Sequence, residues 1–150
     1  MTEYHLAQYN IATALYDLDD PHMEGFMGCL DEINALAEQA SGFIWRLQSE
    51  SGNATDIKVY EDPRVVVNMS VWQDVDSLFE YTYHSDHVRV FADRRSWFHG
   101  HQKQAALVLW WIPAGHRPDA LEGKQRLAHL QEHGPSPEAF TIKKRFPKPV

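Results

Sequence analysis

The sequence predicts an α+β protein with a ferredoxin-like βαββαβ unit and a C-terminal helix-strand extension. Segments that alternate with a period of two, typical of strands, lie between segments whose apolar residues recur every three or four positions, typical of helices. In chain order these segments run β-α-β-β-α-β and then α-β, which is a split βαβ unit with an appendix. The length of 150 residues fits one domain, 1–150, in which 113–150 form the extension.

The first strand and the first helix are predicted from their periodicity. Residues 4–12 alternate loosely, and one face of this strand has two amides, Gln8 and Asn10, which can simply face solvent on an open sheet. In 22–40, apolar residues at three- and four-residue spacing predict an amphipathic helix with one buried stripe. An Asp-Asp-Pro sequence just before it favours a helix start.

A second strand is predicted at 43–47, after the glycine that ends the helix. Its alternation places Trp45 on one face and Arg46 on the other. A long polar connection follows from 48 to 63, and 58–60 can add a short edge strand inside it. Such a connection often contributes to the mouth of a site, although mobility alone would also explain its composition.

Residues 64–72 form the clearest strand, and its two faces differ. One face is wholly apolar, whereas the other mixes a carboxamide, a hydroxyl and an indole, as the wall of a polar pocket would: Asn68, Ser70 and Trp72. Asp74 is a good N-cap for the helix that follows. We expect this helix to be interrupted or re-capped at 85–86 and to resume as far as Phe98.

The last third of the chain is predicted to add two strands and a helix. Residues 106–112 are apolar on both faces, which predicts a strand that is central or covered on both sides. Trp110 and Trp111 must then point to opposite faces. A third helix is expected from 117 to about 133, and 139–146 alternates well enough for a final strand.

The predicted βαββαβ unit would bury only one face of its sheet. Its helices cover one face and leave the other uncovered, yet the strands of this chain have Val, Met, Phe and Trp on both faces. A large apolar face needs a cover. The simplest cover is the same face of a second copy, so the sequence predicts a homodimer.

Composition and charge exclude several classes of partner. A formal net charge of −7 argues against nucleic acid, because phosphates require a basic footprint, and the basic residues near the C-terminus are interpreted as a solvated tail. The N-terminus has no signal-peptide pattern, and no apolar stretch approaches membrane-spanning length. The single cysteine, Cys29, suits a reducing cytoplasm, which is the expected location.

Several sequence blocks resemble a bacterial family known only as a domain of unknown function. They cover nearly the whole chain: LAQYNIA, GFIWRLQ with GNAT, NMSVW, RRSWF, LVLWWIPAGHRP and HGPSPEAFT. A wider resemblance, to the dimeric α/β-barrel superfamily that includes the antibiotic-biosynthesis monooxygenases, rests on NMSVW followed by Leu78, Tyr81, His84, Ser85 and His87. It implies a dimeric α/β barrel. It specifies no reaction, because that superfamily also contains haem enzymes, isomerases, dehydratases and binding proteins.

The leading hypothesis is a cofactor-independent enzyme that acts on a small aromatic or polyketide-type molecule. Monooxygenases of the superfamily are thought to deprotonate a phenolic substrate so that its carbanion reacts with oxygen. His84 or His87 would be the catalytic base, and amide or indole donors would stabilise the substrate. The substrate-binding candidates are Asn10, Trp45, Arg46, Asn68, Trp72, Tyr81, Phe91, Arg94 and Trp110.

The same residues allow other interpretations. Histidines that cap a helix break and tryptophans that fill a core would explain these positions without a site. Arg46 and Arg94 could hold the carboxylate or phosphate of a metabolite in a non-catalytic dimer, or pair with nearby acids. Paired helical histidines can also bind haem or a divalent metal, but the sequence has no H-E-x-x-H motif and no cysteine pair. We therefore predict no cofactor and no metal.

Overall fold

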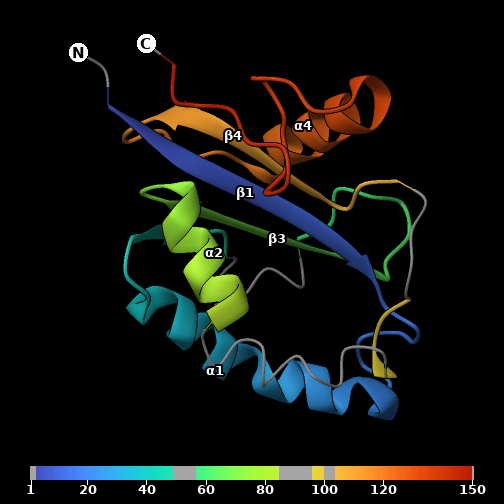
Figure 1. The fold of residues 1–150 in the computed structure, drawn as a ribbon. Coiled ribbons are helices and arrows are strands. Elements are labelled where there is room, and N and C mark those ends of the chain that lie inside the picture. Colours follow the sequence, from blue (N-terminus) through green and yellow to red (C-terminus); the bar gives the residue numbers. More distant parts are fainter. Residues whose placement is uncertain (1–2, 49–56, 85–95, 100–103, 150) are drawn as a thin grey trace.

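The computed structural model describes residues 3–48, 57–84, 96–99 and 104–149, apart from the side chain of His84. Its elements within these ranges are β1 (Tyr4–Thr13), the 3-10 helix η1 (Pro21–Met23), α1 (Glu24–Gln39), β2 (Phe43–Arg46), β3 (Val65–Trp72), α2 (Val75–His84), β4 (Leu107–Pro113) and α4 (Ala120–His133). The strands form one antiparallel sheet in the order β2-β3-β1-β4 (Figure 1). This arrangement confirms the predicted α+β class.

β1 is the strand around which the sheet is built, because it pairs with both β3 and β4 along most of its length. The register with β3 places Asn10 opposite Asn68 and Gln8 opposite Ser70. Successive side chains of a strand point to opposite faces, so these four residues and Trp72 lie on the same face of the sheet. The polar face predicted for 64–72 is thus continued by β1.

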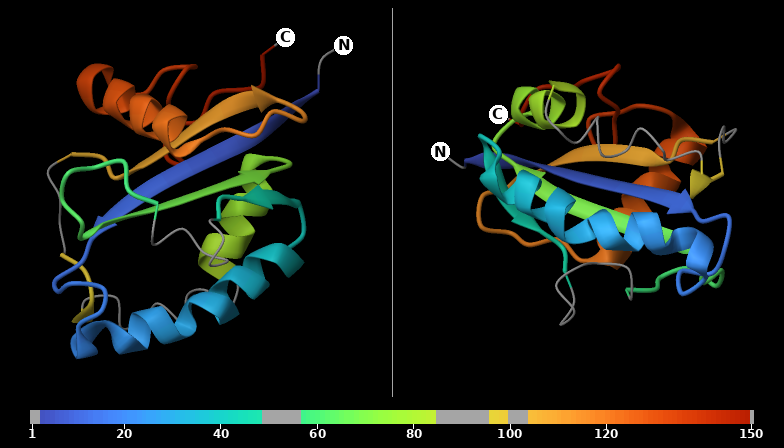
Figure 2. Two further views of the ribbon diagram at one scale, coloured as in Figure 1. Left: turned by 180° about the vertical axis from the view of Figure 1, so that it is seen from behind. Right: turned by 90° about the horizontal axis from the view of Figure 1, so that it is seen from below.

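The opposite face of the sheet is apolar and is covered by α4. Leu127 and Leu130 of α4 pack on it, together with apolar side chains from the connection at 57–60. Figures 1 and 2 show α4 lying over β4 and β1. The buried residues of this face come from the three longest strands: Ala7, Tyr9, Val67, Met69, Val71, Val108, Trp110 and Ile112.

This cover removes the basis on which a homodimer is predicted. None of those eight sheet residues is more than 2 % exposed in the single chain. The apolar area expected to require a second copy is buried by the chain's own extension. Periodicity shows that a face is apolar, but it does not show which later helix packs on that face.

The predicted final strand at 139–146 does not form. Phe140 makes one isolated bridge with Leu109 of β4, through a backbone hydrogen bond in each direction. The chain then turns, and the hydroxyl of Thr141 accepts a hydrogen bond from the Lys144 backbone N–H. Alternation in this segment instead places apolar side chains against the sheet, where Ile142 and Phe146 join the core next to Phe140.

Two other expected segments also differ from the prediction. Residues 58–60 form no strand, because they pack against α4, where Lys124 donates to the Val59 carbonyl. Phe98 forms an isolated bridge with Ala14 after the end of β1 rather than lying in a helix. α2 is described as far as His84, and the predicted interruption at 85–86 lies outside the described residues.

α1 lies over the polar face and is anchored near both ends. Near its N-terminus, Phe26 packs on Trp97 and Phe98, with ring centroids 5.9 and 4.8 Å apart. Near its C-terminus, Glu38 pairs with Arg46 of β2 at 2.8 Å. α2 covers the end of the same face next to Trp72, with Val75 and Leu78 in the core.

The tight seating of α4 on Tyr9 gives a testable prediction. A Cβ atom added at Gly123 would lie 2.3 Å from Cδ2 of Tyr9, a buried ring that cannot move aside. We expect Gly123→Ala to lower the free energy of unfolding by about 1–3 kcal/mol, measured by chemical denaturation. Gly28→Ala is the matched control, because nothing lies within 4 Å of that position.

The control should stabilise the protein by up to about 1 kcal/mol, since alanine replaces glycine inside an exposed stretch of α1. A Gly123→Ala variant as stable as the Gly28→Ala variant would contradict the close contact between α4 and β1.

Candidate functional site

The candidate site is a group of four polar side chains in the middle of the sheet, which we call the polar floor: Gln8 and Asn10 of β1, and Asn68 and Ser70 of β3. Gln8 Nε2 donates to Asn68 Oδ1 at 3.3 Å and lies 3.4 Å from its backbone oxygen. The Asn68 side-chain oxygen thus accepts from Gln8, and its Nδ2 group has two protons to donate elsewhere.

Exposure varies across the polar floor in a way that points to a binding surface. Gln8 and Ser70 are only 5 % and 8 % exposed, so both are fixed in the sheet. Asn10 is half-buried, and Asn68 is exposed although it lies between other strand residues on the face beneath α1. Asn68 is therefore a hydrogen-bonding residue that is open to solvent beside neighbours that are fixed in the sheet.

Aromatic side chains border the polar floor at the α2 end. Trp72 is fully buried, and its ring centroid lies 5.1 Å from that of Tyr81 and 5.5 Å from that of Phe43. Its indole N–H donates to Ser70 Oγ at 2.8 Å. Trp72 is therefore a support for Ser70 and for the neighbouring rings, and its donor is already used.

Tyr81 links the two helices above the polar floor. Its hydroxyl donates to the backbone oxygen of Ile33 in α1, at 3.3 Å. Burial raises the pKa of Tyr81 to about 12, so the phenol is neutral at ordinary pH. Tyr81 can border an aromatic ligand, but it cannot serve as a base near neutral pH.

Arg46 borders the polar floor on the β2 side. It pairs with Ser70 in the sheet, and its Nε donates to Glu38 on α1. The guanidinium therefore connects β2 to α1. Of the two roles considered for Arg46 from the sequence, this is the pairing with a nearby acid. One helical turn before Glu38, the amide nitrogen of Asn34 is buried without a hydrogen-bond partner.

Two of the predicted binding residues lie away from the polar floor. Trp45 pairs with Val71 and packs in the core beneath α4, and Trp110 is fully buried in the same core. The Trp110 indole N–H donates to Glu122 at the start of α4. The structure thus brings Asn10, Asn68, Trp72, Tyr81 and Arg46 together and places Trp45 and Trp110 on the opposite face.

The remaining candidates fall outside the part of the chain that the structure describes. They are the side chain of His84, and all of His87, Phe91 and Arg94. The backbone of His84 is described and is the last described part of α2. Their roles remain predictions from the sequence.

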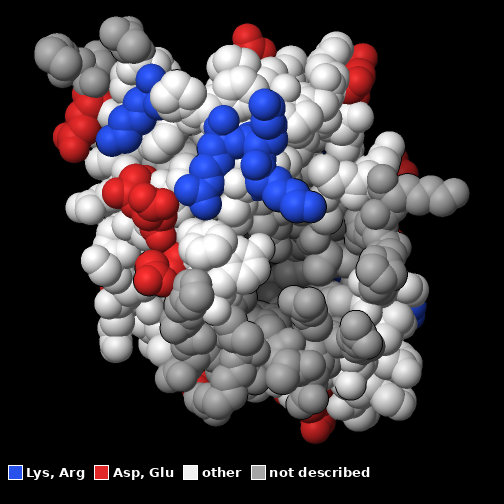
Figure 3. All heavy atoms as spheres, viewed as in Figure 1, with Lys and Arg blue, Asp and Glu red and all other residues white. Residues whose placement is uncertain are grey.

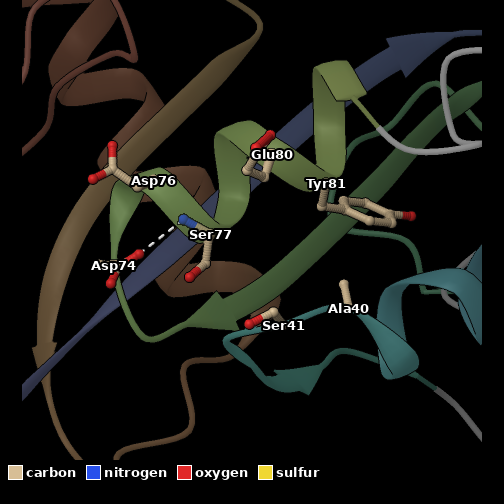
Figure 4. A pocket seen from close by; sticks show the side chains of 7 residues that line it. All are labelled: Ala40, Ser41, Asp74, Asp76, Ser77, Glu80 and Tyr81. Atoms are coloured by element: carbon tan, nitrogen blue, oxygen red, sulfur yellow. Dashed lines mark hydrogen bonds between the residues drawn. The ribbon is translucent and has the colours of Figure 1, made fainter.

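A separate acidic cleft of about 400 Å³ lies between α2 and the turn after α1. Figure 4 shows Ser77 and Tyr81 on the side of α2 that faces Ala40 and Ser41. Asp74 accepts from the Ser77 backbone N–H as the N-cap of α2. The cleft shares only Tyr81 with the surroundings of the polar floor.

Charges near this cleft are partly compensated by the C-terminal segment. Asp76, which also lines the cleft, pairs with Arg145 at 3.3 Å. Figure 3 shows Lys and Arg side chains gathered beside acidic ones on this face of the molecule. Asp74 caps α2 and Asp76 pairs with Arg145, so these two carboxylates have structural roles. We therefore assign the cleft no ligand.

Metal and thiol chemistry find no support among the described residues. No group of three or more His, Cys, Asp or Glu side chains in those ranges is placed to hold a metal ion. Burial raises the pKa of the Cys29 thiol, which donates to the Phe26 carbonyl, so it is a poor nucleophile. None of the described helices is long and apolar enough to cross a membrane.

Sequence reasoning omitted Gln8 and Ser70 from the site residues. Their alternation with apolar neighbours was the available signal, since two polar residues on one face of each strand indicate a polar row. Only the register shows that the two rows meet. Asn34 had no comparable signal, because one asparagine beside an apolar stripe is common in helices.

A family model described as Domain of unknown function (DUF3291) matches residues 5–150. The match covers almost the whole chain, and it confirms the resemblance to an uncharacterised family. The chain belongs to this family. No curated protein matches it.

Three solved structures to which this chain is similar share little sequence with it. SnoaB, a cofactor-independent oxygenase from Streptomyces nogalater, is 13% identical, with a TM-score of 0.45 over 77% of this chain and 96% of its own. PA3566 from Pseudomonas aeruginosa is 12% identical, with a TM-score of 0.47 over 79% of this chain and 99% of its own. NE2512 from Nitrosomonas europaea, a protein of unknown function, is 13% identical, with a TM-score of 0.46 over 80% and 100%.

The raised pKa of Tyr81 predicts how stability depends on pH. The folded chain keeps this phenol protonated up to about pH 12, whereas the unfolded chain ionises from its ordinary value of 10.0. The difference in pKa stabilises the folded chain fully below pH 10, and this stabilisation is lost as pH rises towards 12. Over that range the free energy of unfolding falls by at most about 1.4 kcal/mol per pH unit.

Tyr81→Phe should reduce that slope in urea denaturation series recorded at alkaline pH. Part of the slope will remain, since burial also raises the pKa of Tyr9 and Tyr60. Tyr83→Phe, which removes an exposed hydroxyl from the same helix, should leave the free energy of unfolding at neutral pH unchanged. An unaltered alkaline slope in Tyr81→Phe would show that this phenol is not buried.

Proposed function

We propose that this DUF3291 protein is a small-molecule enzyme that oxidises an aromatic or polyketide-type metabolite with dioxygen, without a bound cofactor, at the polar floor. The observation that supports it most directly is the contact from Gln8 to Asn68 Oδ1, which holds the side chain of a residue that is exposed on this face of the sheet. An amide donor whose position is fixed by a neighbour can stabilise a developing oxyanion once bound substrate excludes water from it.

The proposed substrate has a phenolic or enolic oxygen on a fused aromatic ring. Its oxygen would accept from Asn68 Nδ2, with Asn10 on the neighbouring strand as a second amide within the same row. Tyr81 would border the ring, because it is an aromatic side chain next to the floor and is held by Ile33. Trp72 and Ser70 would act as supports behind these contacts.

The reaction needs a base and no external reductant. The base removes a proton from an activated methylene group, and the resulting anion, stabilised through its oxygen, reacts with dioxygen. The methylene carbon exchanges both C–H bonds for a carbonyl; one oxygen atom enters the product and the other leaves as water. The substrate supplies all the electrons that dioxygen accepts. His84, the last described residue of the helix that carries Tyr81, is our candidate base, with His87 as the alternative.

A non-catalytic metabolite-binding protein is the second candidate. One observation favours it: among the described residues around the polar floor, Arg46 is engaged with Glu38 and Tyr81 is protonated, so none of them can act as the base. With either function, we also propose the predicted cytoplasmic location and the ferredoxin-like, dimeric barrel assembly. The covered apolar face gives the dimer no support.

Anthrone, which has an activated methylene and a phenolic tautomer, is a suitable probe. Oxygen uptake and anthraquinone formation would be measured with the protein and corrected for spontaneous oxidation. We expect Asn68→Leu to lower the protein-dependent rate by roughly a hundredfold, as for loss of an oxyanion donor. Gln125→Leu, an amide-to-leucine change on exposed α4 surface, should leave the rate unchanged.

Binding and turnover are separated by His84→Ala. The proposal requires this variant to bind anthrone but to lose turnover. Binding would be measured by the change in tryptophan fluorescence. Binding without any turnover in the unaltered protein would favour the metabolite-binding alternative. A rate unaffected by Asn68→Leu would reject the polar floor as the site.

A further inference from the structure

A second, smaller cavity lies on the opposite face of the sheet, between α4 and the connection at 57–60. Its volume is about 170 Å³. Figure 2 (left) shows this connection running beside α4, and Lys124 joins the two by donating to the Val59 carbonyl at 2.6 Å. The cavity is lined by three apolar side chains, Ile11, Leu127 and Ala128, and by Tyr60, Lys124 and Gln131. Three apolar and three polar residues therefore line the cavity, and we call the polar three its rim.

The rim contains a phenol whose proton points to no described acceptor. The buried Tyr9 hydroxyl donates to the Tyr60 hydroxyl oxygen at 3.0 Å. Because each hydroxyl has one proton, the Tyr60 proton remains available to a further acceptor. Donation from Tyr9 also polarises Tyr60 and strengthens it as a donor. Burial raises the pKa of Tyr60, which keeps this proton in place at ordinary pH.

The second donor on the rim is the Lys124 ammonium group. Nζ lies 4.7 Å from the centre of the Tyr60 ring and uses one of its three protons on Val59. Within the described ranges, no carboxylate lies at ion-pair distance from Nζ. Lys124 is thus a half-buried cation beside a cavity with apolar lining residues. An anion with an apolar body would match both the charge and the apolar lining.

We propose that this cavity binds a small organic carboxylate with a ring or short chain of about the size of benzoate. The carboxylate would accept from Lys124 Nζ and from the Tyr60 hydroxyl, and its apolar body would lie on Ile11, Leu127 and Ala128. The volume agrees with this size, because an apolar cavity of roughly 150 Å³ holds a benzene ring. The site is independent of the polar floor, which lies across the sheet.

Benzoate is the probe, titrated into the full chain by isothermal calorimetry. Lys124→Met keeps the aliphatic stem but removes the charge, and it should weaken benzoate binding by roughly tenfold or more. Tyr60→Phe should weaken binding by roughly three- to tenfold, since it removes one neutral donor. Benzylamine, which has the same ring and the opposite charge, should not bind.

Two control variants locate the effect. Lys143→Met removes an exposed lysine of the C-terminal segment and should leave benzoate affinity unchanged. Asn68→Leu should also leave it unchanged, because the polar floor is on the other face. Benzoate affinity that is lost in Asn68→Leu and kept in Lys124→Met would overturn this proposal, as would equal binding of benzylamine.

A measurement on the unaltered protein does not depend on variant folding. Acetylation of lysines by a limiting amount of acetic anhydride would be mapped by mass spectrometry with and without benzoate. We expect benzoate to protect Lys124 and to leave Lys143 as reactive as before. Equal modification of Lys124 in both samples, at a benzoate concentration that saturates the calorimetric signal, would reject the site.

Discussion

The pairing of β1 with β3 is the constraint on which the rest of the structure depends. This register places Asn10 opposite Asn68 and Gln8 opposite Ser70, and so sorts polar side chains to one face and apolar ones to the other. Because side chains alternate with a period of two, a shift by one residue would exchange the two faces. Burial of the apolar face beneath α4 holds the register and thereby keeps the polar residues together.

The two faces have different covers, and the covers differ in how closely they pack on the middle of the sheet. α4 presses on Tyr9 so closely that only a glycine fits at position 123. α1, in contrast, is anchored through Phe26 near one end and Glu38 near the other, and Asn68 beneath it stays exposed. The contact at Gly123 is thus closed to any ligand, whereas Asn68 on the other face stays open to solvent.

Local patterns predicted most strands and helices, and the two-faced character of 64–72, because those features depend on periodicity. They could not predict that α4 covers the apolar face, that Arg46 is engaged by Glu38, or that 139–146 makes only isolated bridges. Each of these is a contact between distant parts of the chain. The same limit applies to Trp45 and Trp110: alternation separates neighbours within a strand, but only pairing shows which faces of different strands coincide.

The position of α4 late in the chain has a consequence for synthesis. During translation, β1 and β3 leave the ribosome well before Ala120–His133, so their apolar surface has no intramolecular cover for that interval. Pairing of β1 with β4 likewise joins residues that are separated by most of the chain. Such late closure slows folding and exposes an aggregation-prone surface. The nascent chain therefore has a defined window in which a chaperone can bind it, and this window closes when α4 docks.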